Sequence, residues 1–317
     1  MIPRMLLAIA LMGFSLAAEA QFPSRPLRVV VPFPAGSATD ALSRVLANSV
    51  SQPLGQPVVV ENKAGADGAI AAAEVAKSAP DGYTLLMATN SPMSAVPAMK
   101  KSPPYDPVAD FTPITDIGRY TFFIVVHPEV PAKSLAELIG YARAHPGRLN
   151  YATGNTSGIV STAYFASLAK IELVHVPYKG EPQALTDLVA GRVQLMFVSS
   201  GTSLPLLRDG KLRALVTTLA RRSALLPEVP TIAEAGMAQF SLTSWAGLFG
   251  PAKMPREVVE RLNREFVAAM GRAEVQAAMD RQGFALNPSS PEQLAQLVKQ
   301  QLESYRRILR AAGVEPD

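Results

Sequence analysis

Residues 27–40 read LRVVVPFPAGSATD, an apolar run that leads through a loop of small residues into a helical pattern. Residues 27–31 predict a buried strand, because the run is short and apolar on both faces. The loop carries Gly36, which allows unusual backbone angles, and N–H groups at the start of the following helix favour an anion. The alternative is an ordinary strand-to-helix turn, capped by a threonine or by Asp40 binding the amides of its own helix.

The alternation of strand and helix patterns continues through the chain and predicts parallel sheets with right-handed crossovers. A second set of alternating elements follows the proline-rich, irregular stretch 103–113. We therefore expect an α/β protein with two lobes, each a sheet flanked by helices. The predicted strands are residues 27–31, 58–60, 84–87, 122–126, 149–151, 173–176, 194–198, 212–217 and 244–249; the predicted helices are residues 41–50, 67–77, 134–144, a helix after 157, 182–190 and the C-terminal part, with an apolar stripe from 294 to 309.

Two of these strands are expected to cross between the lobes, residues 122–126 outward and residues 244–249 on the return. The first lobe is then discontinuous and comprises residues 21–121 and 243–317, so that the C-terminal helices return to it. The second lobe comprises residues 122–242.

A second loop resembles the first in composition and place. Residues 151–158 read YATGNTSG, so a strand again ends in a loop of Gly, Ser and Thr before a helix. Ligands of open α/β sheets bind at the carboxyl ends of strands, and two such loops can face each other across a cleft. Neither loop is a Walker A or GxGxxG motif. From the residues alone, a ligand site and two ordinary turns both remain open.

The N-terminal segment has the pattern of a secretory signal. Arg4 precedes an uncharged, mostly apolar run over residues 5–18, and residues 18–20 read AEA, the small-x-small form of a signal-peptidase site. The run is too short to span a bilayer. We expect cleavage after Ala20 and a soluble periplasmic protein that keeps no membrane anchor.

Composition excludes several classes of protein. The 317 residues are 48% hydrophobic, which excludes a disordered chain, and the length suits two domains. The net charge of +4 comes from scattered basic residues, so no nucleic-acid partner is expected. Because cysteine is absent, there is no thiol nucleophile, disulfide or zinc–thiolate site.

Enzyme interpretations find little support in the sequence. No GxSxG elbow occurs, and a triad of Ser157, His175 and Asp187 is a combination that any chain of this length offers. His175 is expected to be a structural polar residue. Three aspartates between residues 106 and 116 suit turns better than a metal site, and the lone Trp245 is expected in the core.

The chain resembles the substrate-binding proteins of tripartite tricarboxylate transporters, also called the Bug receptors. The similar segments occur in the same order over nearly all of the chain after residue 20. They are residues 25–40, 55–62 with Gly65 and Gly68, 79–85, 105–107 with 110–111, 175–180, 210–215, 227–231 with 234–236, and Ser244-Trp245.

This resemblance implies a type II periplasmic binding-protein fold, two lobes joined by a hinge. It implies capture of a small carboxylate between the lobes and delivery to membrane permease subunits, by a monomer without catalysis, cofactor or metal. A periplasmic sensor that signals to a membrane histidine kinase is the first alternative. An exported α/β hydrolase is the second.

The resemblance also implies which residues hold the ligand. In the family, one carboxylate is held chiefly by backbone amides and ordered water from the two loops. The matching positions are Phe33, Ala35, Gly36, Ser37, Ala38 and Asp40 in the first loop; Thr153, Gly154, Asn155, Thr156, Ser157 and Ser161 in the second; Thr89 and Asn90 from the first lobe; and Ser199 and Ser200 from the second.

Departures from the family pattern lead to two expectations. The first loop has less glycine than usual, which makes its backbone stiffer, and the second loop differs from the commoner form. A Gly36→Val change is expected to crowd the approach of a ligand to the backbone and to weaken binding while the fold stays intact. Val198 stands where relatives commonly have aspartate. If position 198 lines the cleft, and neither Asp40 nor Glu61 supplies the charge, the ligand should be a carboxylate without an α-amino group.

Overall fold

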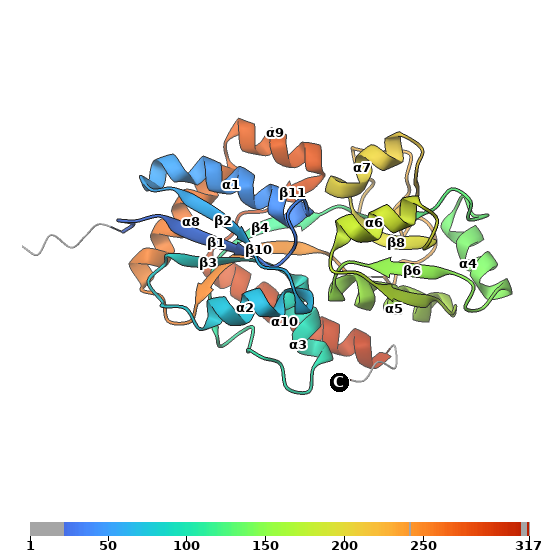
Figure 1. Ribbon diagram of the computed structural model, residues 1–317, viewed down its shortest axis with the longest axis horizontal. Helices are drawn as coiled ribbons and strands as arrows, with labels where there is room; N and C mark the ends of the chain where they lie inside the picture. The colour runs from blue at the N-terminus through green and yellow to red at the C-terminus, as the bar shows by residue number, and fades with distance from the viewer. Residues whose placement is uncertain (1–21, 241, 312–315, 317) are drawn as a thin grey trace, which may run out of the picture.

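The structure is a computed structural model that describes residues 22–240, 242–311 and 316. The predicted signal segment, residues 1–20, lies outside this range. Two sheets with their helices form two lobes side by side, as Figure 1 shows. This is the expected two-lobed α/β architecture. The expectation of parallel sheets is corrected, because each sheet combines parallel and antiparallel pairs.

The sheet of lobe 1 has six strands in the order β11-β4-β10-β3-β1-β2. β1 lies between β2 and β3 and runs parallel to both, whereas β10 is antiparallel to both β3 and β4. The carboxyl ends of β1 and β3 therefore lie at the same edge of the sheet. The bounds are β1 (Leu27–Val31), β2 (Val58–Asn62), β3 (Thr84–Thr89), β4 (Phe111–Tyr120), β10 (Trp245–Pro251) and β11 (Phe284–Leu286).

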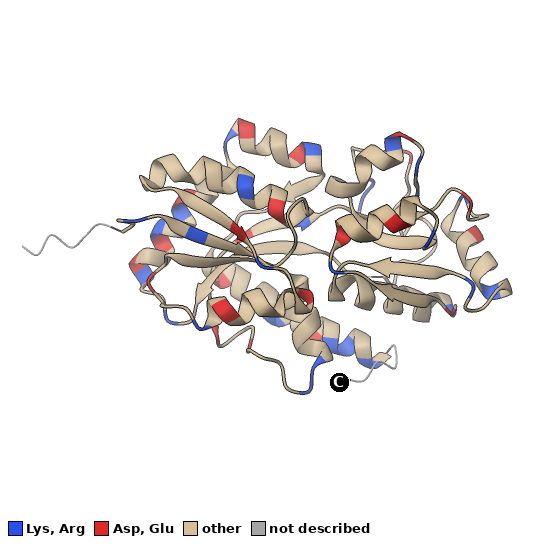
Figure 2. Ribbon diagram, in the orientation of Figure 1, with Lys and Arg blue, Asp and Glu red and all other residues tan. Residues whose placement is uncertain are grey.

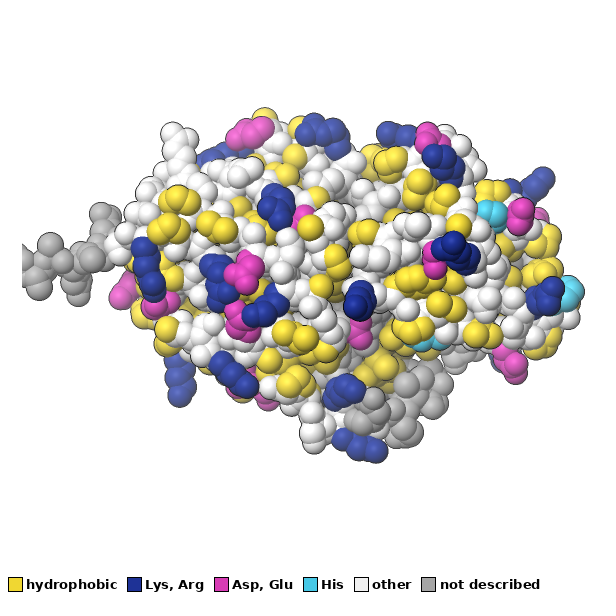
Figure 3. Space-filling view, viewed as in Figure 1, with side chains coloured by type: hydrophobic (Ala, Val, Ile, Leu, Met, Phe, Trp, Pro, Cys, Tyr) yellow, Lys and Arg dark blue, Asp and Glu magenta, His cyan; other side chains and the backbone are white. Residues whose placement is uncertain are grey.

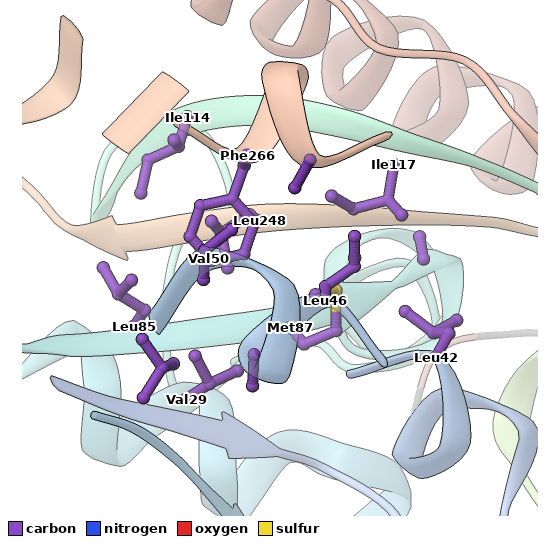
Figure 4. Packing of buried hydrophobic residues seen from close by; sticks show 14 of the residues in the cluster. Val29, Leu42, Leu46, Val50, Leu85, Met87, Ile114, Ile117, Leu248 and Phe266 are labelled. Carbon is purple, nitrogen blue, oxygen red and sulfur yellow. The ribbon is translucent and has the colours of Figure 1, made fainter. Parts of the chain in front are cut away.

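Helices cover both faces of this sheet because alternate strand residues point to opposite sides. Val29 belongs to the apolar cluster under α1 (Ala38–Leu54), α8 (Arg256–Met270) and α9 (Ala273–Gln282), where Leu46 of α1 packs as Figure 4 shows. Val30 belongs to the cluster under α2 (Ala69–Ala76) and the start of α10 (Pro291–Ala311). Trp245 is fully buried in this second cluster, so its prediction as a core residue is confirmed.

The sheet of lobe 2 has five strands in the order β7-β6-β8-β5-β9. α5 and the end of α10 pack on one face, and α6 packs on the other. The strands are β5 (Phe122–Val126), β6 (Asn150–Thr153), β7 (Val174–Pro177), β8 (Leu195–Ser199) and β9 (Arg213–Thr217), and the helices are α4 (Leu135–Ala144), α5 (Thr156–Ala169), α6 (Glu181–Val189) and α7 (Ser200–Arg208).

The chain passes from lobe 1 to lobe 2 at Thr121, between β4 and β5. Its N–H donates to the Gly283 carbonyl at 3.0 Å, and its own carbonyl accepts from the Ser200 N–H at 2.8 Å. The expectation that residues 122–126 and 244–249 are crossing strands is therefore corrected. β5 lies wholly in the second sheet and β10 in the first, so the outward crossing is a single residue before β5.

Helix α10 belongs to both lobes. Leu294 and Val298 near its start pack with Trp245 in lobe 1, and Tyr305 and Ile308 near its end pack in the core of lobe 2. The predicted apolar stripe is confirmed, but only α8 and α9 return wholly to the first lobe. The sequence analysis missed four elements: β4, β11, α7, and the π-helical turn Ser91–Ala95 with the short α3 (Val96–Met99) that continues it.

Charged side chains are spread over both lobes. Figure 2 shows basic and acidic residues on most helices, and the face in Figure 3 mixes the two signs without a single-sign stripe. Within residues 22–240 and 242–311, no helix is both long and apolar enough to span a bilayer.

Candidate functional site

The candidate site is a cavity of about 40 Å³ between the two lobes. A space of this size holds only a few water molecules, so a ligand can reach it only if the lobes move apart. Each lobe contributes the start of a long helix, α1 or α5, to its wall. The lining residues are Phe33, Ser37, Ala38, Thr39, Thr89, Asn90, Tyr120, Phe122, Gly154, Asn155, Ser157, Glu181, Ser199 and Ser244.

Hydrogen bonds within the chain hold the first loop in place. Ser37 caps α1, and its Oγ accepts from the Asp40 N–H at 3.3 Å. Gly36 has φ +80°, a conformation that glycine adopts without strain, and its N–H donates to Asp40 Oδ2 at 3.0 Å. The N–H groups of Ala38 and Thr39 lie in the first turn of α1, where a helix provides no internal acceptor. These two N–H groups are available at the cavity wall.

Asp40 shapes this loop and does not line the cavity. Its carboxylate accepts from Asn62 Nδ2 at 2.9 Å and pairs with Arg44 at 2.9 Å. Burial works to raise the pKa of Asp40, but hydrogen bonds from Arg44, the Gly36 N–H and Asn62 outweigh it and lower that pKa below its usual value. Asp40 is therefore a charged clamp on the loop before its helix. The cap of α1 is Ser37, and not a threonine or Asp40 as the alternative expected.

The second loop is held in a similar way. Asn155 caps α5, and its Oδ1 accepts from the Gly158 N–H at 2.9 Å. Gly154 packs so closely against α6 that an added Cβ would lie 2.4 Å from the Glu181 nitrogen. Gly154 is therefore needed for contact between the loop and α6.

The residues of the hypothetical triad are not assembled. His175 Nε2 lies 2.6 Å from Thr153 Oγ1 and its ring stacks on Tyr151, so it has the structural role that we expected. Asp187 accepts from the Tyr178 hydroxyl at 2.7 Å and pairs with Arg192. Without a Ser157–His175 hydrogen bond in the described structure, the hydrolase alternative loses its basis.

Asn90 joins the two lobes at the cavity. Its Nδ2 donates to Ser157 Oγ at 2.9 Å and also to the buried Tyr305 hydroxyl of α10, and its Oδ1 accepts from the Trp245 N–H at 3.4 Å. One amide thus connects the end of β3, the start of α5, β10 and α10. The structure is accordingly a closed form, with the lobes in direct contact.

Glu181, at the start of α6, is a buried acidic side chain that the sequence analysis missed. It lines the cavity with 7% of its surface exposed. Its carboxylate accepts from Ser199 Oγ at 2.7 Å, Thr202 Oγ1 at 2.9 Å and the Ser199 N–H at 3.4 Å. Burial raises the pKa of Glu181, and these hydrogen bonds offset only part of that effect. The available signal was its place directly after the family-like segment 175–180.

The structure brings nine of the sixteen predicted site residues to the cavity wall. Whether they contact a ligand stays a prediction. Those at the wall are Phe33, Ser37, Ala38, Thr89, Asn90, Gly154, Asn155, Ser157 and Ser199; those away from it are Ala35, Gly36, Asp40, Thr153, Thr156, Ser161 and Ser200; and those that the sequence analysis missed are Thr39, Tyr120, Phe122, Glu181 and Ser244.

Two of the residues away from the wall have other roles. Ser200 joins the lobes, since its Oγ donates to the Gln282 carbonyl at 2.6 Å. At Gly36 an added Cβ would meet no atom within 4 Å. A side chain at position 36 is costly because of the backbone angle φ +80°, and the Gly36 N–H already donates to Asp40. Weaker ligand binding by Gly36→Val stays a prediction.

The expectation based on Val198 is also corrected. Val198 is fully buried with Phe123 and Met196 in the core of lobe 2 and does not line the cavity. Asp40 is paired with Arg44, and Glu61 pairs with Arg28 at 2.8 Å. The carboxylate at the cavity is Glu181.

The three aspartates between residues 106 and 116 serve turns and an ion pair. Asp106 Oδ1 accepts from the Val108 and Ala109 N–H groups, and Asp116 pairs with Arg119 at 2.8 Å. In the described part of the chain, no group of His, Asp or Glu is arranged to hold a metal ion.

Comparisons with known proteins agree with this geometry. The model of the tripartite tricarboxylate transporter family receptor matches residues 42–314. A relative described as the UPF0065 protein in the tcbD-tcbE intergenic region of Pseudomonas sp. (strain P51) is 38% identical, over 96% of this chain and 93% of the relative.

Two solved structures with ligands share the fold. R. palustris Rpa4515 with adipate is 34% identical, has a TM-score of 0.90, and covers 93% of this chain and 100% of its own. MatC from Rhodopseudomonas palustris with bound malate is 32% identical, has a TM-score of 0.86, and covers 91% of this chain and 100% of its own.

Proposed function

Because the chain belongs to the tripartite tricarboxylate transporter receptor family, we propose that it is a periplasmic receptor that binds a small carboxylate between its lobes and delivers it to a membrane permease. Receptors of this family bind solutes and catalyse no reaction.

One observation carries the carboxylate assignment: two helix N-termini, one from each lobe, meet at the cavity. Ala38 and Thr39 begin α1, and Asn155 and Ser157 begin α5. The first turn of a helix offers free N–H groups and the positive end of the helix dipole, so both favour an anion. Two relatives have been solved with adipate and with malate, both of which are small dicarboxylates.

Ligand binding can be tested with a panel of small carboxylates in a thermal-shift assay. A ligand present at 100 times its dissociation constant should stabilise the protein by about 2.7 kcal/mol. Ala38→Leu should abolish that shift, because the added atoms fill the cavity at the start of α1. Ala41→Leu, on the same helix but away from the cavity, should keep it. If no carboxylate shifts the wild-type melting temperature, the ligand class is wrong.

Delivery to a permease requires a separate test in cells. Deletion of the gene should abolish uptake of the ligand at low concentration, and the wild-type gene should restore uptake while the Ala38→Leu variant should not. In the alternative role, signalling to a histidine kinase, deletion would leave uptake by an existing transporter unchanged and remove only the transcriptional response.

A further inference from the structure

Glu181 is the only Asp, Glu, Lys, Arg or His that lines the cavity in the described structure. It is buried, yet no ion pair joins it to a basic side chain within residues 22–240 and 242–311. The nearby titratable group is the Tyr120 phenol, and burial raises the pKa of that phenol, which keeps it neutral. A buried carboxylate without a cation is costly, so this feature calls for an explanation.

The groups around Glu181 are arranged for its charged form. Two hydroxyls, from Ser199 and Thr202, and the Ser199 N–H donate to its oxygens. Donors that converge on a carboxylate stabilise the ionised state. These donors provide no net positive charge and offset only part of the cost of burial, so the ionised form of Glu181 needs a counter-charge, which a ligand in the cavity can supply.

We propose that Glu181 is a specificity-determining residue that binds a protonated amino group, so that the preferred ligand is a carboxylate that also carries an ammonium group, as an amino acid does. This inference rests on the proposed carboxylate receptor. The helix N-termini of α1 and α5 bind the carboxylate end of the ligand, and Glu181 binds the cationic end. This inference reverses the ligand preference expected from Val198. A carboxylate is present at the cavity, but it belongs to Glu181 of α6 and not to position 198.

Calorimetry with matched pairs tests the proposal. Each pair differs only in the amino group: aspartate and succinate, glutamate and glutarate, alanine and propionate, phenylalanine and 3-phenylpropionate. For the pair of the right size, we expect the wild-type protein to bind the amino acid at least about tenfold more tightly, because a charge-assisted hydrogen bond in a buried site is worth about that much.

The variant Glu181→Gln should remove this preference. Affinity for the amino acid should fall by about tenfold or more, while affinity for the partner without the amino group should stay within about threefold. Glu172→Gln, an exposed glutamate in the same lobe, should leave both affinities unchanged. Without ligand, Glu181→Gln should melt at a higher temperature than the wild type at neutral pH, because it removes an unpaired buried charge.

Each contrary outcome has a distinct meaning. If the wild type binds the partner without the amino group as tightly or more tightly, the inference is overturned and the carboxylate receptor stands. The inference also fails if Glu181→Gln keeps the preference, or if a folded variant loses both ligands equally. If none of the carboxylates binds, the proposed function itself is wrong.

Discussion

At the scale of single residues, the polar side chains around the cavity divide into those that build the loops and those that line the wall. Sequence patterns located the two loops, because a strand, small residues and a helix follow one another there. They left the role of Asp40 open, because that role depends on Asn62, which is 22 residues away in the chain. Glu181 was missed because its hydrogen-bond partners, Ser199 of β8 and Thr202 of α7, come from two elements later in the chain.

The clamp formed by Asp40 predicts a pH-dependent contribution to stability. Asp40→Asn should lower the free energy of unfolding by about 1–2 kcal/mol at pH 7, since it removes charge-assisted hydrogen bonds. The pKa of Asp40 is lowered in the folded state. The difference between wild type and variant should therefore be complete above the unfolded pKa of about 4, and should disappear as the pH falls through the lower folded pKa.

Urea unfolding at several pH values between 3 and 7 measures this difference. Asp209→Asn provides the control, since Asp209 belongs to an exposed surface pair with Lys211 whose contribution should be small at every pH. A constant difference for Asp40→Asn down to the lowest pH would contradict the clamp.

At the scale of helices and strands, regular apolar patterns were predicted well and interrupted ones were missed. β1 and β3 each contain a run of at least three apolar residues, VVV and LLMA, and their prediction is confirmed. β4 was missed because proline, aspartate, glycine and arginine interrupt its apolar residues, and α7 because it combines Ser and Gly with an internal proline. In both elements, long-range pairing and packing outweigh local propensity.

Gly118 of β4 allows the close approach of β11, and a substitution there tests how much stability this approach contributes. At Gly118, with φ +149°, an added Cβ would lie 2.0 Å from the Ala285 carbonyl oxygen of β11. Gly118→Ala must therefore push β11 away from β4, at a cost of about 1–3 kcal/mol in addition to the backbone strain. We expect a lower free energy of unfolding and loss of amide protection in β11.

Gly210→Ala is a control that separates the cost of backbone strain from the cost of pushing β11 away from β4. Gly210 also has a positive φ, +69°, but nothing lies within 4 Å of an added Cβ. This control should cost only the strain of about 1–2 kcal/mol. Equal losses for the two variants, measured by urea unfolding, would mean that the approach of β11 is not the reason for Gly118.

At the scale of the whole molecule, the two lobes were expected from the two sets of alternating strands and helices and from the family resemblance, whereas the contacts that join the lobes were not expected. Thr121 connects the sheets through Gly283 and Ser200, and α10 is buried in both cores. These contacts pair residues far apart in the chain, and no local pattern marks them. The lobes are connected by Thr121, by the return of the chain between β9 and β10, and by α10, so we expect a rotation about these connections when the cavity opens.

Closure of the lobes can be opposed by a single methyl group. In the closed structure, a Cβ added at Gly180 would lie 2.8 Å from Cγ of Pro34, a residue of the opposite lobe. Gly180 has φ −179°, an extended conformation that any residue adopts, and the closest contact of the added Cβ within its own lobe would be with Gln183 Oε1, at 3.2 Å, which is the end of a flexible side chain. The variant should favour the open form, because the methyl group clashes only when the lobes meet.

The measured consequence is weaker ligand binding in a stable protein. Overpacking of about 1–3 kcal/mol in the closed form corresponds to a loss of affinity between about fivefold and a hundredfold, while the ligand-free melting temperature should hardly change. Small-angle scattering should show that the wild type becomes more compact with a saturating ligand, and that Gly180→Ala needs more ligand for the same change. Gly140→Ala, where an added Cβ meets no atom within 4 Å, should behave as the wild type.

Scattering profiles of the wild type that are identical with and without ligand would contradict closure of the lobes. Unchanged affinity in Gly180→Ala would mean that Pro34 and Gly180 do not approach each other in the bound state.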